Sequence, residues 1–330
     1  MSRGLGDVYK RQGIYLANNE TSAADSQAQG RHTLTVTDST IEGTWGIGVQ
    51  YTDVDISGDK TQVTAQNNAL EISRRETNET DGKTLGDMNI TGGKFTGQIY
   101  VEEDKDQQTS SAQLTISGGT FQNVNGEKYD VSEYYSSGLT QDENGTVIVD
   151  PGEAVAKIGN VNYLTLTGAL GKAQNGDTVI LLQNAELSQA ITSGVTLEVP
   201  KDVTLTINDL TTVAGSEGKL KVDAGGTLDV GGTNMIGGSD ANINLTEGHI
   251  EINKEADALA LNFVGATAEI PLGKRWTTVK TVGQTQVPMN VTLDENTTLT
   301  VSSTNNEDGF RVANNSILTN NGKVVVNGVM

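Results

Sequence analysis

Residues 114–121 are LTISGGTF, and they nearly repeat residues 88–95, MNITGGKF. A looser relative, LTVTDSTI, occupies residues 34–41. Each copy alternates apolar and polar residues, turns at Gly-Gly or Asp-Ser, and then adds one more apolar residue: Phe121, Phe95 or Ile41. This pattern is typical of a short strand followed by a tight corner. A motif that recurs in this way predicts a structural building block rather than an active site.

A second short motif alternates with the first along the chain. It occurs as GIYL at residues 13–16, GIGV at 46–49, ALEI at 69–72 and QIYV at 98–101. The segments between the two motifs are polar and unequal in length, for example SRRETNETDGKTLGD at residues 73–87. Fixed strands with a variable loop in each repeat predict a solenoid whose loops gather on one face.

The C-terminal part repeats at a regular spacing. Residues 195–209, 218–232 and 241–255 align at 23 residues, which predicts three columns of apolar side chains. These columns are Leu197–Leu220–Ile243, Val199–Val222–Leu245 and Leu205–Leu228, and the last copy brings in Ile250 and Ile252 through a shorter turn. Further on, residues 291–301 and 316–326 align at 25, which pairs Leu293 with Leu318, Leu299 with Val324 and Val301 with Val326.

These periods predict an all-β chain built as a parallel β-solenoid. Each repeat stacks its strands about 4.8 Å from the previous one, so backbone groups pair between repeats. A β-sandwich is the structural alternative, because strands about eight residues apart also suit hairpins. The identical columns at 23 residues favour the solenoid, since a sandwich gives no reason for them.

The segment between the two repetitive parts differs from both. Asn144-Gly145 predicts a hairpin, residues 166–173 predict a short helix ended by Asn175-Gly176, and residues 178–182 predict a buried strand. Gly168 and Gly171 weaken the helix. We therefore expect four parts: a non-native segment at 1–12, a β-helix at 13–128, a junction module at 129–184 and a second solenoid segment at 185–330.

Composition excludes several classes of function. The chain has 330 residues, a net charge of −20 and no cysteine, which argues against nucleic-acid binding, disulfides and thiolate-bound metals. No run of 18 or more apolar residues predicts a membrane span. Leu, Ile and Val recur too regularly for a disordered chain.

The repeats and the junction carry a resemblance to a known family. GIYV-like and LTISGGTF-like strands are similar to the right-handed parallel β-helix, or pectin-lyase-like, regions of large surface proteins from gut-type bacteria. Residues 154–182, AVAKIGNVNYLTLTGALGKAQNGDTVILL, and residues 316–328, SILTNNGKVVVNG, resemble further modules of the same proteins. The resemblance implies an exported, cell-surface, adhesin-like protein. Residues 7–12, DVYKRQ, resemble the translation of a transposase adapter used for sequencing libraries, so we expect the native N-terminus to be missing.

The sequence contains few candidate site residues. Glu102, Glu103, Asp104 and Asp106 are weak calcium candidates in a variable loop, where a solvated acidic loop is the simpler interpretation. His32 and His249 lie in or beside alternating strands and are expected at ordinary surface positions. Trp45, Tyr51 and Trp276 are isolated in sequence, and Tyr129, Tyr134 and Tyr135 are expected to close the first β-helix. No catalytic residue, cofactor or phosphate-binding loop is predicted.

We therefore expect a non-enzymatic, extracellular, adhesin-like or scaffold segment. Its partners would be host or microbial glycans or surface proteins, bound through the variable loops at residues 18–32, 73–87 and 102–113. The first alternative is a β-helix lyase or hydrolase for acidic glycans, which would need Asp residues with Lys or Arg on consecutive repeats. The second alternative is a purely mechanical stalk.

Overall fold

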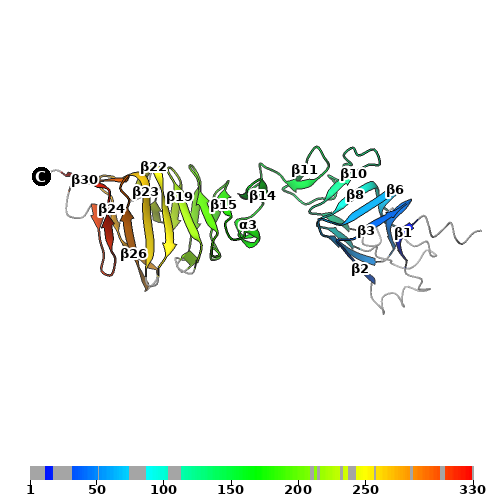
Figure 1. Ribbon diagram of the computed structural model, residues 1–330, viewed down its shortest axis with the longest axis horizontal. Coiled ribbons are helices and arrows are strands. Elements are labelled where there is room, and N and C mark those ends of the chain that lie inside the picture. The colour runs from blue at the N-terminus through cyan, green and yellow to red at the C-terminus, as the bar shows by residue number, and fades with distance from the viewer. Residues whose placement is uncertain are drawn as a thin grey trace, which may run out of the picture. The chain divides into compact units, whose positions relative to one another are not determined.

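A computed structural model describes most of the chain. The described residues are 12–17, 32–50, 52–73, 87–102, 113–208, 212–213, 216–230, 233–236, 243–255, 258–282, 285–304 and 309–328. They divide into two compact units, Met1–Asp150 and Pro151–Met330 (Figure 1). The boundary falls within the expected junction module, so residues 129–150 belong to unit 1 and residues 151–184 to unit 2. The protein is all-β in class, and the described residues include the short helix named below.

Unit 1 contains two sheets of parallel strands. The first pairs β1 (Gln12–Ala17), β4 (Trp45–Gln50), β6 (Gln62–Ile72), β8 (Lys94–Val101) and β10 (Thr120–Gln122) in that order, and β3 (Thr40–Gly43) also pairs with β6. The second pairs β2 (His32–Thr37), β5 (Thr52–Ser57), β7 (Asp87–Ile90) and β9 (Gln113–Ile116). Each strand pairs with its equivalent from the next repeat, and we call these successive levels rungs.

The strand pairing arranges the first motif of unit 1 in columns. Leu34, Val54, Met88 and Leu114 align, as do Val36, Ile56, Ile90 and Ile116, and the column of Ile41, Val63, Phe95 and Phe121. Most of these side chains belong to one buried apolar cluster. The Phe95 and Phe121 rings stack with their centroids 4.9 Å apart. Each buried large apolar side chain stabilises the unit by roughly 1.5–3 kcal/mol relative to exposure.

The second motif forms columns of its own. Ile14, Ile47, Leu70 and Ile99 align across the first sheet, followed by Leu16, Val49, Ile72 and Val101. Both predicted motifs therefore occupy matching places in successive rungs. A corner of the chain separates the columns of Ile14 and Leu16 from the column of Phe121. Small residues lie along this corner. A Cβ atom built on Gly46 would lie 2.3 Å from the Ala69 carbonyl oxygen, because the neighbouring backbone runs so close.

Residues 123–150 cover the last strands of unit 1. Tyr129, Tyr134 and Tyr135 pack against its apolar cluster, as predicted, and the Tyr129 hydroxyl donates to the Ile99 carbonyl at 3.2 Å. The predicted hairpin at Asn144-Gly145 joins β11 (Leu139–Gln141) to β12 (Val147–Val149). The buried Gln141 side-chain amide donates to the carbonyls of Tyr129 and Gly145 at 3.0 and 2.9 Å. This segment is held to the sheets by both packing and hydrogen bonds.

Unit 2 begins with a small mixed element. β13 (Ala156–Ile158) pairs antiparallel with β14 (Val161–Tyr163) and with β15 (Thr178–Leu181), and α3 (Leu166–Lys172) packs beside them. The Thr165 side chain caps the helix start by accepting from the Gly168 N–H at 3.0 Å. The predicted helix stop is wrong. The C-cap is Ala173 in an extended conformation, while Gly176, at φ +95°, serves the next turn instead.

Parallel strands follow in two stacks. One contains β15, β17 (Thr196–Val199) and β19 (Lys219–Asp223), and the other contains β16 (Ala185–Glu186), β18 (Thr204–Ile207) and β20 (Thr227–Val230). Leu197 pairs with Leu220, Val199 with Val222 and Leu205 with Leu228, so the 23-residue alignment is confirmed for its first two copies.

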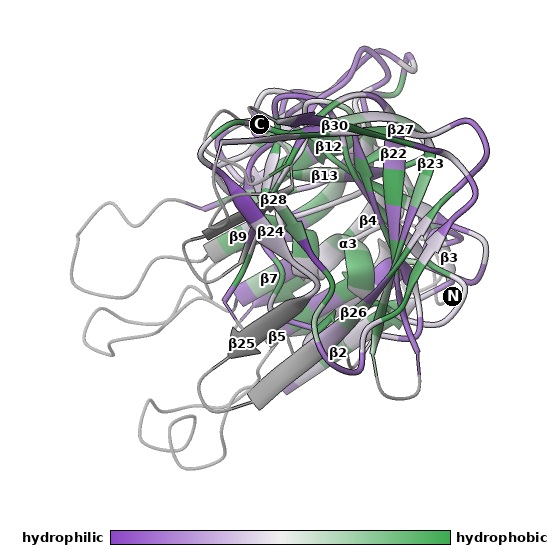
Figure 2. Ribbon diagram, turned by 90° about the vertical axis from the view of Figure 1, so that its left-hand side faces the viewer, coloured by the Kyte–Doolittle hydropathy of each residue, from purple (hydrophilic) through white to green (hydrophobic). Residues whose placement is uncertain are grey.

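The third copy of that alignment is wrong. β21 (Thr233–Ile236) returns antiparallel along β20, and β22 (Asn244–Lys254) runs antiparallel to β19. Ile252 and Ile250 therefore lie opposite Leu220 and Val222, in the places expected for Ile243 and Leu245. Figure 2 shows the alternation of hydrophobic and hydrophilic residues along β22. That alternation is the same in both chain directions, so it cannot distinguish parallel from antiparallel pairing.

The remaining strands return to mainly parallel pairing after an antiparallel hairpin of β22 and β23 (Leu259–Ile270). They are β24 (Arg275–Thr277), β25 (Val279–Val282), β26 (Thr285–Leu293), β27 (Thr298–Ser303), β28 (Gly309–Arg311), β29 (Leu318–Asn320) and β30 (Lys323–Gly328). Leu299 pairs with Val324 and Val301 with Val326, as predicted. Leu318 pairs with Val291 rather than Leu293, because the corner between β29 and β30 is two residues shorter than the one between β26 and β27.

An aromatic cluster fills the core of these last strands. The Trp276 ring stacks on Phe310 at 4.9 Å between centroids and meets Phe263 at 6.0 Å. Trp276 is 2% exposed, and among the described residues its indole N–H finds no hydrogen-bond acceptor. Trp276 is therefore a core residue rather than an exposed binding platform.

Candidate functional site

Four outward residues line up across the first sheet of unit 1. Tyr15 pairs with Gly48, Gly48 with Glu71, and Glu71 with Tyr100, on strands β1, β4, β6 and β8. Their neighbours in each strand belong to the inward apolar columns, and strand residues alternate between faces. Tyr15 and Tyr100 are 45% and 46% exposed. We call Tyr15, Gly48, Glu71 and Tyr100 the aromatic row.

Gly48 gives the row its shape. A Cβ atom at this position would lie 3.1 Å from Cδ2 of Tyr15, which is closer than side chains normally pack. The Tyr15 ring therefore extends over the neighbouring strand at the one position in the row that has no side chain. A larger residue at position 48 would move this ring away.

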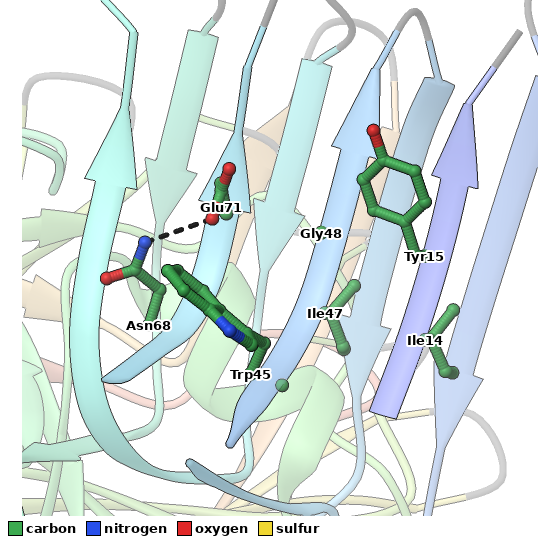
Figure 3. A pocket seen from close by; sticks show the side chains of 8 residues that line it. Ile14, Tyr15, Trp45, Ile47, Gly48, Asn68 and Glu71 are labelled. Carbon is green, nitrogen blue, oxygen red and sulfur yellow. Dashed lines mark hydrogen bonds between the residues drawn. The ribbon is translucent and has the colours of Figure 1, made fainter. Parts of the chain in front are cut away.

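A small hollow lies at the Tyr15 end of the row. It encloses about 30 Å³, and its lining includes Tyr15, Trp45, Gly48, Asn68 and Glu71. The Asn68 side-chain nitrogen donates to Oε2 of Glu71 at 3.0 Å (Figure 3). A hollow of this size can take the edge of a ligand but cannot enclose one.

The lining combines two kinds of contact surface. Tyr15 and Trp45 offer aromatic rings, while Glu71 and Asn68 offer side-chain oxygens. Amphipathic ligands with an apolar face and a polar edge suit such a mixture. Hydrolysis of a glycosidic bond by the usual two-carboxylate route needs a pair of carboxyl groups, and Glu71 is the single carboxylate in this lining. The arrangement therefore offers a ligand both aromatic rings and hydrogen-bond acceptors.

A larger hollow of about 500 Å³ lies against the first described rung. Its lining includes Ile14, Leu34, Val36 and Ile41, which are members of the inward apolar columns. The same lining includes the exposed Thr35 and Thr40, so the hollow is open at the end of the inward columns.

The second sheet of unit 1 has an acidic outer face. Asp53 accepts from the Asp87 backbone N–H at 3.0 Å, and Asp55 accepts from the Asn89 side chain at 3.2 Å. The sequences of β2, β5, β7 and β9 contain no Lys or Arg. These four strands therefore do not supply the Asp and Lys or Arg combination that the lyase alternative requires.

Unit 2 has a mixed cluster of charges on consecutive strands. Lys221 on β19 lies 3.4 Å from Glu198 on β17 and 3.0 Å from Asp223, and we call these three residues the charge cluster. On the neighbouring β22, Glu251 lies 3.6 Å from Lys219 and 3.7 Å from His249. Opposite charges in adjacent strands stabilise a sheet modestly, so this cluster has a structural explanation.

Burial raises the pKa of Glu198 above its ordinary value of 4.5, and a hydrogen bond with Asp223 adds to this, while Lys221 opposes it. Burial alone would lower the pKa of Lys221, but its contacts with Asp223 and Glu198 outweigh burial and raise it. The closer Lys221–Asp223 contact is therefore the main ion pair. A carboxyl group whose pKa is raised by folding stabilises the folded state most at pH values below its unfolded pKa. This stabilisation is lost as the pH rises through the folded pKa.

We expect Glu198→Gln to gain stability relative to the wild-type chain as pH rises from about 4 to about 7. The amide avoids the cost of a half-buried charge, and Lys221 keeps Asp223 as its partner. Urea unfolding of unit 2 at both pH values measures the difference, with the exposed Glu217→Gln as control. A variant that loses stability relative to wild type over this range would contradict the sign of the pKa shift.

The other predicted site residues have separate positions. Of the calcium candidates, Glu102 follows β8 and its backbone N–H donates to Ile72, while Glu103, Asp104 and Asp106 lie outside the described residues. Within the described ranges, no group of three or more acidic or His side chains could hold a metal. His32 is exposed on β2, and His249 is half-buried on β22. Most of each variable loop lies outside the described residues.

Comparison with protein-family models, curated proteins and solved structures finds no match for this chain. Among the described helical residues, none forms a helix long and apolar enough to cross a membrane.

The aromatic row was not predicted from the sequence, although a signal for it existed. The third position of the GIYL and QIYV motifs is Tyr, and the same alternation that makes Ile14 and Ile99 inward makes Tyr15 and Tyr100 outward.

Proposed function

We propose that this chain is a non-enzymatic segment of an extracellular bacterial surface protein, adhesin-like in its role. In this proposal, unit 1 is a right-handed parallel β-helix of the pectin-lyase-like kind, and unit 2 continues as a β-solenoid interrupted by the β22–β23 hairpin. The inward columns hold the rungs together, and the outer face of the first sheet binds a partner. The resemblance of the repeats to surface-protein modules supports the proposed location at the cell surface.

The aromatic row is the observation that carries the proposal. Tyr15 and Tyr100 are about half exposed on the outer face of the sheet, and neither belongs to the buried apolar cluster of unit 1. Tyr and Trp are enriched where proteins bind partners, because one ring offers both apolar area and a polar tip. The row also lies one or two residues before the ends of β1, β6 and β8, which precede the three variable segments.

We expect the double variant Tyr15→Ala/Tyr100→Ala to weaken attachment of the whole chain about tenfold or more. Each aromatic contact is worth about 0.5–1.5 kcal/mol beyond its area, and 1.4 kcal/mol is tenfold in affinity. The measurement is binding of labelled chain to epithelial cells and to an array of neutral and acidic glycans. Val124→Ala/Ile148→Ala, which removes two exposed apolar side chains elsewhere in unit 1, is the matched control.

Equal attachment of wild type and the double variant would remove the row from the proposal. Attachment abolished by both double variants would indicate a general folding defect, which circular dichroism of each variant detects.

The enzyme alternative, a lyase or hydrolase for acidic glycans, predicts new chain ends when the protein is incubated with polyuronates. Within that alternative, the variant Lys221→Met tests whether the charge cluster is responsible for the cleavage. A mechanical stalk predicts no attachment at all.

A further inference from the structure

We infer that the aromatic row binds a neutral glycan chain that lies across the strands, with one sugar residue at the hollow between Tyr15 and Trp45. This inference rests on the proposed function, and it adds the chemical class and the direction of the ligand. It combines the charge of the row, the shape of the hollow and the spacing of the rungs.

The charge of the row disfavours acidic ligands. Glu71 lies between the two Tyr residues, and the polar groups nearest to it in the lining are uncharged. The chain as a whole has a net charge of −20. The carboxylate of a uronate would be repelled by the like charge of Glu71. Sugar hydroxyls, in contrast, donate readily to a carboxylate.

The polar contacts in the hollow match hydroxyl donors. Asn68 donates to Oε2 of Glu71 and thereby holds the carboxylate in place. The second carboxylate oxygen of Glu71, which lines the hollow, remains as an acceptor. A pyranose ring offers hydroxyl groups at its edge and C–H groups on its face. Its edge can donate to the Glu71 carboxylate while its face covers the Tyr15 or Trp45 ring.

The spacing of the row fixes the direction of the ligand. Tyr15 and Tyr100 are separated by three strand spacings of about 4.8 Å, or about 14 Å. A single sugar at the hollow cannot reach Tyr100, whereas a chain of several sugars can cover both rings and Glu71 between them. Because paired residues lie perpendicular to the strands, such a chain crosses β1, β4, β6 and β8.

A ligand with positive charge is the competing class. Lys or Arg side chains are also attracted to aromatic rings and to a carboxylate. The row favours the glycan because its two rings are separated by Gly48 and Glu71 rather than gathered around one cation. A basic peptide would also bind less tightly as salt concentration rises, while a neutral ligand would not.

The test is calorimetric titration of the whole chain with neutral oligosaccharides of glucose, mannose, xylose and galactose, one to six residues long. Oligogalacturonate and oligolysine of the same lengths are the competing probes. We expect at least one neutral series to bind, with affinity that rises at least tenfold from one to four residues. We expect this affinity to change less than threefold between about 0.05 and 0.5 M salt. Tightest binding to oligogalacturonate or oligolysine, or no binding of any neutral series, would overturn the inference.

Variants identify the groups responsible. Gly48→Val should weaken every neutral oligomer at least fivefold, because it displaces the Tyr15 ring. Glu71→Lys should abolish neutral binding and admit oligogalacturonate, whereas Gln98→Ala, an exposed change on β8 outside the row, should leave binding unchanged. Equal binding by wild type and Gly48→Val would contradict the assignment. If cells still attach through Tyr15 and Tyr100 while no neutral oligomer binds, the inference fails and the proposed function stands.

Discussion

Replacing Phe121 with Ala is expected to lower the free energy of unfolding of unit 1 by about 3–5 kcal/mol. Phe121 is 1% exposed, and its ring stacks on Phe95 with an interplanar angle of 6°. It ends the column that begins at Ile41, and residues 123–150 pack over the same end. The substitution therefore leaves a cavity that the rigid backbone of paired strands closes poorly.

Urea unfolding followed by circular dichroism measures this loss. Val124→Ala is the control, because Val124 is 59% exposed only three residues away. Its effect is expected to stay within about 0.5 kcal/mol. A Phe121→Ala variant that loses less than about 1 kcal/mol would show that the column does not hold the rungs together.

Gly97→Ala is expected to destabilise unit 1 by about 2–6 kcal/mol. Gly97 has φ +129°, which side chains rarely adopt, and a Cβ atom would lie 2.6 Å from the Asn67 carbonyl oxygen. Two costs therefore add, one from the backbone conformation and one from the close neighbouring rung. No rotation of a flexible side chain can relieve a contact with backbone.

Thermal unfolding of Gly97→Ala and of the neighbouring Gln98→Ala separates these costs from the general effect of a change on β8. Gln98 is exposed, so its replacement should leave the melting temperature nearly unchanged. Equal melting temperatures for Gly97→Ala and wild type would mean that the corner of the rung at position 97 tolerates a side chain. The close stacking of rungs at that corner would then be wrong.

The parts predicted correctly from sequence are those that depend on local alternation. Leu114, Ile116 and Phe121 occupy equivalent places in two or three copies of one motif, and identical spacing placed them in columns. The turn of the chain at β21 was missed, since Ile243 and Leu245 continue the same alternation whether the strand runs forward or back. The shifted pairing of Leu318 depends on the length of a corner, which a fixed repeat length does not capture.

The candidate site was less predictable for a different reason. Trp45 is isolated along the sequence, and so is each Tyr of the row, because the residues between them include whole loops. Register brings them together: Tyr15 and Tyr100 are 85 positions apart in sequence but only three rungs apart in the sheet. Recognition was expected in the variable loops, while the described residues instead offer a surface on the sheet beside them.

We propose that the inward columns build the fold while the aromatic row binds a partner. The two Trp residues allow a direct test, since Trp45 lines the hollow and Trp276 is buried in unit 2. In a Trp276→Phe variant, Trp45 is the single fluorescent indole, and it reports on the hollow alone. Titration with the neutral oligosaccharides should shift its emission to shorter wavelength in a saturable manner, and Tyr15→Ala should remove the response. Unchanged Trp45 emission at a concentration where the same variant is saturated in calorimetry would contradict the account.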